Sequence, residues 1–232
     1  MQMGTNFSFI EENYKRILYN VDETVAKYRK SDEKVDIIAV TKTVAPDAVN
    51  FAISCGINKI GENRVQEYLS KKDYYDKKAD VHFIGHLQSN KVKYIINDIN
   101  LIQSVDSIKI AQQINNFAEK TGKIQDILIE VNVGGEETKY GISPNMLKDT
   151  VLEISTLNNV KIKGLMTILP INASEEIFYK MQKLYIDILE ENIDNIDMKI
   201  LSMGMSNDYQ TAIKYGSNMI RVGSALFGER VY

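Results

Sequence analysis

Lys42 is the residue whose position in this sequence most directly indicates chemistry. It ends residues 35–42, an otherwise apolar run typical of a buried strand, and the chain then turns at Pro46 into a helical pattern. A lysine at the end of a packed strand can present its amine at the mouth of a pocket. Near the other end of the chain, Ser206 and Gly223 lie in segments that fit a phosphate-binding site. An amine facing a bound phosphate predicts a phosphorylated aldehyde held on Lys42 as a Schiff base.

The predicted phosphate site draws on two segments, residues 201–206 and 221–224. Ser206 follows an expected strand and precedes an expected helix, where unpaired backbone N–H groups and the helix dipole favour an anion. Gly223 allows the backbone to approach a ligand closely, and Ser224 adds a hydroxyl. The alternative for residues 203–206 is a simple turn followed by a helix cap.

Arg221 lies within a run that has the pattern of a buried strand, residues 219–222. A buried guanidinium needs an acceptor, because an unpaired buried charge costs several kcal/mol. A pyridine nitrogen is one such acceptor, and a protein carboxylate is the other. Since arginine remains protonated, it would donate to a pyridine nitrogen, keep the ring neutral and weaken it as an electron sink.

The elements that must position these residues alternate between strand and helix along the chain. Eight strands are expected, at residues 35–42, 59–61, 81–85, 100–104, 127–133, 161–168, 199–202 and 219–223. Helical periodicity occurs between them, and an additional helix is expected within residues 1–30. Eight such units predict an α/β fold, a single (β/α)₈ TIM barrel with an extra N-terminal helix packed on it, formed by residues 1–232 as one domain. An open doubly wound sheet is the alternative.

Composition and charge argue against several classes of protein, among them nucleic-acid-binding and membrane proteins. The net charge of −3 argues against nucleic-acid binding as the main task, since that usually requires a basic excess. The single cysteine, Cys55, excludes an internal disulfide. No apolar run approaches the ~18 residues of a membrane span, and the first residues lack a signal-peptide pattern. We therefore expect a cytoplasmic protein, and a monomer, that binds neither nucleic acid nor membrane.

Several motifs, spread over almost the whole chain, resemble those of the pyridoxal phosphate homeostasis protein family, also called proline synthase co-transcribed homologues. The matching segments are residues 39–43, 61–67, 82–91, 164–167, 201–206 and 221–228. They occur in the order expected for that family, so the resemblance is specific.

The resemblance implies the fold of the alanine racemase barrel domain, with pyridoxal 5′-phosphate linked to Lys42. It also implies that Ser206, Gly223 and Ser224 hold the phosphate and that Arg221 faces the pyridine nitrogen. Two further residues, Asn63 and Met166, are implied to line the cofactor site. His82 lies on the third expected strand and could approach the ring, although a strand histidine can equally be a core residue with its hydrogen bonds satisfied. Other family positions are assigned no cofactor contact: we expect a loop hydrogen bond for His86, and a surface ion pair for Glu137 and Lys139.

For function, the resemblance implies a protein that binds the cofactor reversibly, buffers it or delivers it to apo-enzymes, and influences amino-acid and keto-acid pools without a settled turnover reaction. Racemisation needs a base on each face of the substrate carbon, and alanine racemase takes one from a second domain that we do not expect here. The alternative is a true pyridoxal-phosphate enzyme, such as a weak racemase, with His82 or Tyr140 as base. A class I aldolase would explain the lysine and the phosphate site but not Arg221.

Overall fold

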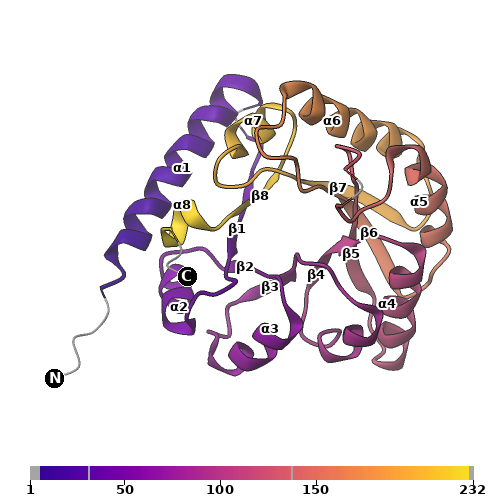
Figure 1. The fold of residues 1–232 in the computed structure, drawn as a ribbon, viewed down its shortest axis with the longest axis horizontal. Helices are drawn as coiled ribbons and strands as arrows, with labels where there is room; N and C mark the ends of the chain where they lie inside the picture. The colour runs from indigo at the N-terminus through magenta and orange to yellow at the C-terminus, as the bar shows by residue number, and fades with distance from the viewer. Residues whose placement is uncertain (1–5, 31, 137, 230–232) are drawn as a thin grey trace.

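A computed structural model shows eight parallel strands closed into a barrel (Figure 1). It describes residues 6–30, 32–136 and 138–229. Each strand pairs with the next along the chain, and β8 pairs with β1 to close the ring. This confirms the predicted TIM barrel and rules out the open doubly wound sheet. The strands are β1 (Asp36–Val40), β2 (Lys59–Glu62), β3 (Asp80–Phe83), β4 (Leu101–Val105), β5 (Gln125–Glu130), β6 (Val160–Met166), β7 (Ile196–Ser202) and β8 (Met219–Val222).

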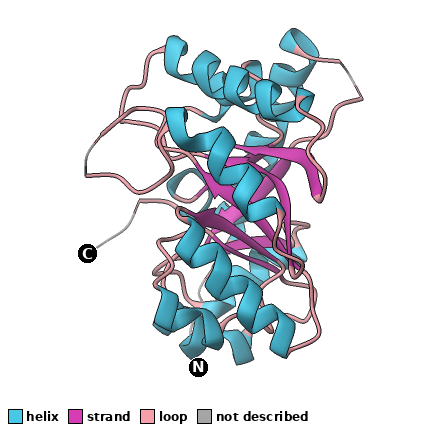
Figure 2. Ribbon diagram, turned by 90° about the vertical axis from the view of Figure 1, so that its right-hand side faces the viewer, coloured by secondary structure: helices cyan, strands magenta, loops and turns pink. Residues whose placement is uncertain are grey.

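Helices surround the strands on the outside of the barrel (Figure 2). Within the described residues, none of them is both long and apolar enough to cross a lipid bilayer. The α-helices are α1 (Ser8–Tyr28), α2 (Pro46–Ser54), α3 (Val65–Lys71), α4 (Ile108–Lys120), α5 (Leu147–Ser155), α6 (Glu175–Glu190), α7 (Tyr209–Lys214) and α8 (Ser224–Phe227). Short 3₁₀ helices are η1 (Lys72–Tyr74), η2 (Ser89–Tyr94) and η3 (Pro144–Met146).

The predicted N-terminal helix is α1, which packs against α7 and α8. Its buried residues recur at helical spacing, among them Ile10, Ile17 and Val21. Asn13 Nδ2 donates to the backbone oxygen of Leu226 at 2.9 Å, which ties the helix to α8. Residues 1–5 of the predicted segment lie outside the described residues.

One predicted helix has a different form. The sequence predicts an α-helix at residues 90–96, but the link from β3 to β4 contains the 3₁₀ helix η2, residues 89–94. The turns of this link close with i→i+3 hydrogen bonds such as Lys91 N to Gln88 O. Val92 and Ile95 are buried there, so the tighter helix still delivers the expected apolar residues to the core.

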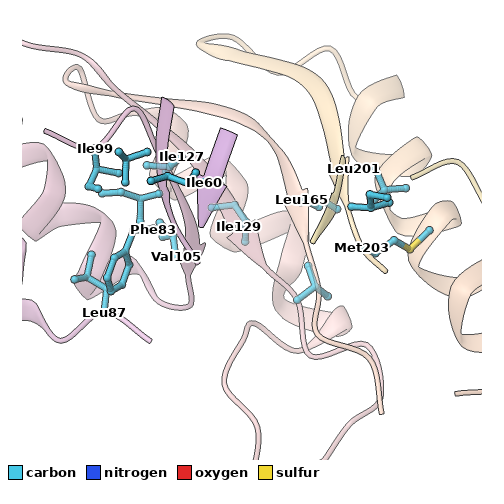
Figure 3. Close-up of a cluster of buried hydrophobic side chains, with 14 of the residues drawn as sticks. Ile60, Phe83, Leu87, Ile99, Val105, Ile127, Ile129, Leu165, Leu201 and Met203 are labelled. Atoms are coloured by element: carbon cyan, nitrogen blue, oxygen red, sulfur yellow. The ribbon is translucent and has the colours of Figure 1, made fainter. Parts of the chain in front are cut away.

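The core has two layers because successive strand residues point to opposite faces of the sheet. Ile127 and Ile129 of β5 pack outward against the helices, together with residues such as Phe83 and Leu165 (Figure 3). Leu128 points inward and packs in a smaller cluster formed only by strand residues: Ile38, Leu101, Leu128, Met166 and Met219, with Ile200 packed beside them. The barrel interior is therefore filled with side chains, and a ligand must bind above it at one end.

Candidate functional site

A cavity of about 430 Å³ lies at the carboxyl ends of β1, β7 and β8. Its volume lies within the range usual for small-molecule sites. Five of the eight predicted site residues line it: Lys42, Ser206, Arg221, Gly223 and Ser224. The loop after β6 adds Pro170, Ile171, Asn172 and Ala173 to its wall. The fold thus brings together residues that are far apart in the sequence, as the sequence predicted.

Lys42 reaches the cavity because of the alternation in β1. Ile38 points into the barrel, and Lys42 lies four residues further on, on the same face of the extended chain. The lysine is partly buried. On the other face, the side chain of Thr41 donates to Glu62 Oε1 at 2.6 Å. Because side chains alternate along the strand, Lys42 faces the cavity while Thr41, on the opposite face, is bonded to Glu62 and holds the backbone in place.

The turn after Lys42 is fixed by a second set of contacts. Thr43 has a φ of 63°, an uncommon conformation for a residue other than glycine. Its backbone N–H donates to Glu67 Oε1. Lys71 Nζ also contacts Glu67 and donates to the backbone oxygen of Thr41 at 3.0 Å. α3 thus holds the backbone on both sides of Lys42 in place.

Two polar atoms at the end of β2 are buried without a hydrogen-bond partner among the described residues. They are Glu62 Oε2 and the side-chain oxygen of Asn63. Burial raises the pKa of Glu62, and the hydrogen bonds from Thr41 and Tyr75 partly offset that effect. Unsatisfied buried acceptors are rare in native proteins and require an explanation. A ligand that donates a hydrogen bond to Asn63 would satisfy one of them, although Asn63 does not itself line the cavity.

Arg221 is 3% exposed and its guanidinium is held by two acceptors that are neutral. Nη1 donates to Ser202 Oγ at 2.6 Å and Nη2 donates to the backbone oxygen of Thr167 at 2.7 Å. Among the described residues it forms no ion pair, so the carboxylate alternative is not what the structure contains. Burial lowers its pKa to about 10, which still leaves it charged at neutral pH. Arg221 lines the cavity, and its guanidinium has further N–H donors besides these two.

The predicted phosphate segments meet at the Ser206 hydroxyl. Ser206 Oγ accepts hydrogen bonds from the backbone N–H groups of Gly223, at 3.2 Å, and Ala225, at 3.1 Å. Convergent backbone N–H groups of this kind are suited to an anion. Gly204 permits the turn that carries Ser206 there, since its φ is 94° and an added Cβ would lie 2.5 Å from Ala212 Cβ. The loops after β7 and β8 therefore form one polar surface.

Besides Asn63, two of the predicted site residues do not line the cavity. Met166 is fully buried in the cluster inside the barrel. His82 is also inside the barrel, with Nδ1 3.0 Å from Gln103 Nε2 and Nε2 3.4 Å from Asp80 Oδ1. Strand position indicates which face a residue occupies but not how deep it lies, so the sequence could not distinguish these positions from the cavity mouth.

The remaining positions singled out from the sequence are at the rim of the barrel. His86 Nδ1 lies 3.0 Å from Asp106 Oδ2, which is the expected loop hydrogen bond. Its ring also stacks on Tyr140, with centroids 3.7 Å apart. Lys139 Nζ pairs with Glu136 Oε2 at 3.0 Å, while Glu137 lies outside the described residues.

Sequence reasoning missed the polar groups that support Arg221. Ser202 and Thr167 come at the carboxyl ends of β7 and β6, within motifs already recognised, but neither had an assigned role. Glu130, at the end of β5, was also missed. Polar residues that end otherwise apolar strands are the pattern that would have identified all three.

Glu130 makes the stability of the folded protein depend on pH. Burial raises its pKa to about 7, Asp106 adds to the shift and Arg221 opposes it. Because the folded pKa is above the unfolded one, wild type loses stability as pH rises from about 4.5 to about 7. We expect Glu130→Gln not to show this loss. The difference in free energy of unfolding between the variant and wild type should therefore shift in favour of the variant by up to roughly 3 kcal/mol from pH 5 to pH 8.

Denaturant unfolding of both proteins at the two pH values measures this difference. Glu153→Gln, at an exposed position of α5, is the control for losing one surface charge. A constant difference between Glu130→Gln and wild type across the pH range would show that Glu130 does not titrate as described.

Comparison with known proteins places this geometry in a family. Residues 13–231 match the family described as the alanine racemase N-terminal domain. The chain is 40% identical over 226 residues to the pyridoxal phosphate homeostasis protein of Aquifex aeolicus, which covers 95% of this chain and 98% of that protein. The protein of the same name from Schizosaccharomyces pombe is 36% identical over 199 residues, 84% of each chain.

A solved structure is similar over the same length. PipY of Synechococcus elongatus PCC7942, determined with PLP bound, superposes with a TM-score of 0.82 at 27% sequence identity. The match covers 94% of this chain and 100% of PipY. The similarity therefore extends over the barrel as a whole, including the strands that border the cavity.

Proposed function

The chain belongs to the family of pyridoxal phosphate homeostasis proteins, and from this premise we propose that it carries pyridoxal 5′-phosphate as a Schiff base on Lys42 and acts in intracellular homeostasis of that cofactor. In this role it buffers or delivers the cofactor, and so affects amino-acid and keto-acid pools. One observation carries the proposal: the cavity joins the Lys42 amine from β1 to the polar loops after β7 and β8.

The residues present fit this cofactor chemically. Its aldehyde needs an amine, which Lys42 supplies at the cavity wall. Its phosphate needs hydrogen-bond donors, and the Ser206 and Ser224 hydroxyls line the cavity together with Gly223, whose N–H donates to Ser206 Oγ. When bound, the cofactor would supply an electron-withdrawing ring, and Arg221, which remains cationic, would limit that capacity if it donated to the ring nitrogen.

The arrangement supports storage better than turnover. A catalytic base must lie within hydrogen-bond reach of the proton that it removes. Of the two candidate bases, His82 has its ring nitrogens directed to Gln103 and Asp80 inside the barrel, and Tyr140 stacks on His86. Neither lines the cavity. The proposal is therefore a non-catalytic carrier, and the weak racemase is the outcome against which it is tested.

The first prediction is that the wild-type protein releases its cofactor to apo-enzymes but turns over no amino acid. Loaded protein is incubated with an apo form of a pyridoxal-phosphate enzyme, in the presence of a trap for free cofactor, and the recovered enzyme activity is measured. Racemase, decarboxylase and transaminase assays accompany it. Steady turnover of about one per second, near the low end of ordinary enzymes, that disappears in Lys42→Ala would contradict the carrier role.

The second prediction concerns the phosphate site. Ser206→Ala combined with Ser224→Ala should weaken cofactor binding more than either change alone, because both hydroxyls are assigned to one phosphate. The expected loss is roughly 1–3 kcal/mol for each contact. Ser155→Ala, at a half-buried position of α5 that does not line the cavity, is the matched control. Dissociation constants from absorption titrations measure the effect, and unchanged constants in the double variant would move the phosphate elsewhere.

The proposal includes two statements about assembly. The protein acts as a monomer, and its partners are the apo-enzymes that accept the cofactor. Sedimentation velocity of the purified protein measures the first, and the transfer experiment above measures the second.

A further inference from the structure

A line of polar side chains crosses the interior of the barrel beneath the cavity. Arg221 Nη1 donates to Ser202 Oγ at 2.6 Å, and Ser202 Oγ donates to Gln103 Oε1 at 2.7 Å. Gln103 Nε2 is 3.0 Å from His82 Nδ1, and His82 Nε2 is 3.4 Å from Asp80 Oδ1. Figure 1 shows β3 and β4, which carry the last three residues, on the opposite side of the ring from β7 and β8.

This line connects the two ends of the barrel. Arg221 lines the cavity at the carboxyl ends of the strands, whereas Asp80 begins β3 at the amino ends. The residues between them are fully or almost fully buried: Ser202, Gln103 and His82. Asp80 is the solvent end, with a side chain that is 28% exposed. Buried polar side chains inside a barrel otherwise filled by apolar residues must be matched to one another.

The direction of the hydrogen bonds follows from the arginine. A guanidinium has donors only, so Ser202 Oγ must accept from it. The Ser202 hydroxyl then donates to Gln103 Oε1, which turns the Gln103 amide so that Nε2 faces His82. Nδ1 of His82 must in turn accept, so the ring of the neutral histidine carries its proton on Nε2, facing Asp80.

The opposite orientation of Gln103 is disfavoured by the same rules. It would remove the acceptor that Gln103 Oε1 provides for the Ser202 hydroxyl, and it would require the proton of the neutral ring on His82 Nδ1, which leaves a bare Nε2 facing the Asp80 carboxylate. The second N–H of the Gln103 amide also faces Met219 Sδ, at 3.3 Å, in the observed orientation. The amide thus has one satisfied orientation, and that orientation couples His82 to Arg221.

We propose that His82 is a positioning residue, which acts through Gln103 and Ser202 to hold the Arg221 guanidinium beside the cavity. The inference deepens the proposed function and rests on it for the identity of the ligand. It replaces the expectation that His82 contacts the cofactor ring. A ligand that engages Arg221 changes the hydrogen bond to Ser202, and the change reaches His82 through groups that do not touch the ligand.

The first test uses protein without cofactor, so it does not depend on the proposed function. The sequence contains two histidines, His82 and His86, so their side-chain ¹⁵N signals are assigned with a single variant, His86→Gln. Long-range ¹H–¹⁵N spectra at pH 8 should show His82 in one tautomer, protonated on Nε2 and bare on Nδ1. A signal from the Nδ1-protonated tautomer, or an average of both, would overturn the relay.

The second test measures coupling to the cavity. Saturation with pyridoxal 5′-phosphate should shift the His82 ¹⁵N signals in wild type and in Ser202→Thr, which keeps the hydroxyl, but not in Ser202→Ala. Cofactor binding should weaken about tenfold in Ser202→Ala and recover in Ser202→Thr. Gln103→Met, which keeps the volume and breaks both links, replaces Ser202→Ala if that variant fails to fold.

The outcomes separate the two proposals. Wild type that binds no cofactor, by its absorption spectrum, contradicts the proposed function, and the tautomer measurement still decides the relay. Wild type that binds the cofactor without any shift of His82, or a shift that persists in Ser202→Ala, overturns the relay and leaves the proposed function intact.

Discussion

Replacing Lys42 with alanine is expected to abolish the covalent attachment of pyridoxal 5′-phosphate while leaving the barrel folded. The amine is the group that reacts with the aldehyde, and no other type of side chain in the cavity wall can replace it. The backbone around it keeps its anchors, because Thr41 is held by Glu62 and Thr43 by Glu67. Visible absorption of the loaded protein should disappear, and far-ultraviolet circular dichroism should be unchanged.

Lys42→Arg is the matched control for charge. It keeps a cation at the cavity wall but cannot form the imine, so it should lose the absorption as well while retaining weak, dialysable cofactor through the phosphate contacts. Lys59→Ala, a lysine of β2 paired with Asp36 at the other end of the barrel, should leave the absorption intact. Persistence of the absorption in Lys42→Ala would show that another amine carries the cofactor.

Gly204→Ala is expected to cost about 3 kcal/mol or more in the free energy of unfolding and to weaken cofactor binding. Its φ of 94° strains any residue with a Cβ, by roughly 1–2 kcal/mol. The added Cβ would also lie 2.5 Å from Ala212 Cβ and 2.9 Å from Tyr209 Cα, so α7 must move. Since the same turn carries Ser206 to the N–H groups of Gly223 and Ala225, the phosphate site is displaced with it.

Gly122→Ala separates the two components of this cost. Gly122 has a φ of 66°, and an added Cβ would meet nothing within 4 Å, so the variant reports backbone strain without a clash. Urea unfolding of both variants measures the difference between them. Equal losses would contradict the close contact with α7, and normal cofactor binding by folded Gly204→Ala would contradict the role of this turn in the site.

The barrel could be predicted because each strand–helix unit has its own recognisable sequence pattern. Apolar runs such as residues 127–129 of β5 and 219–222 of β8 recur between helical patterns, and eight of them suffice for closure. Boundaries were less well predicted, as in β5, which ends at Glu130 although the apolar run continues to Val133. There the chain pairs in an isolated bridge between Val131 and Ile142 instead of extending the strand.

The cavity was predictable where a residue near or just beyond the carboxyl end of an expected strand carries a distinctive group, as Lys42, Arg221 and Ser206 do. The contacts that hold these residues in place could not be predicted, because they depend on how neighbouring elements sit against one another in three dimensions. Ser202 at the end of β7 and Thr167 just after β6 accept from Arg221, and Glu67 reaches Thr43 from α3. His82 shows the same limit, since its depth inside the barrel is set by the register of β3 with its neighbours.

The most direct test of the carrier proposal is to locate the covalent link. Wild-type protein is incubated with pyridoxal 5′-phosphate, reduced with borohydride, digested and analysed by mass spectrometry. We predict a single phosphopyridoxyl group, on the peptide that contains Lys42. Reduction that labels a different lysine, or that leaves the protein unlabelled while its absorption is lost on dialysis, would contradict the account.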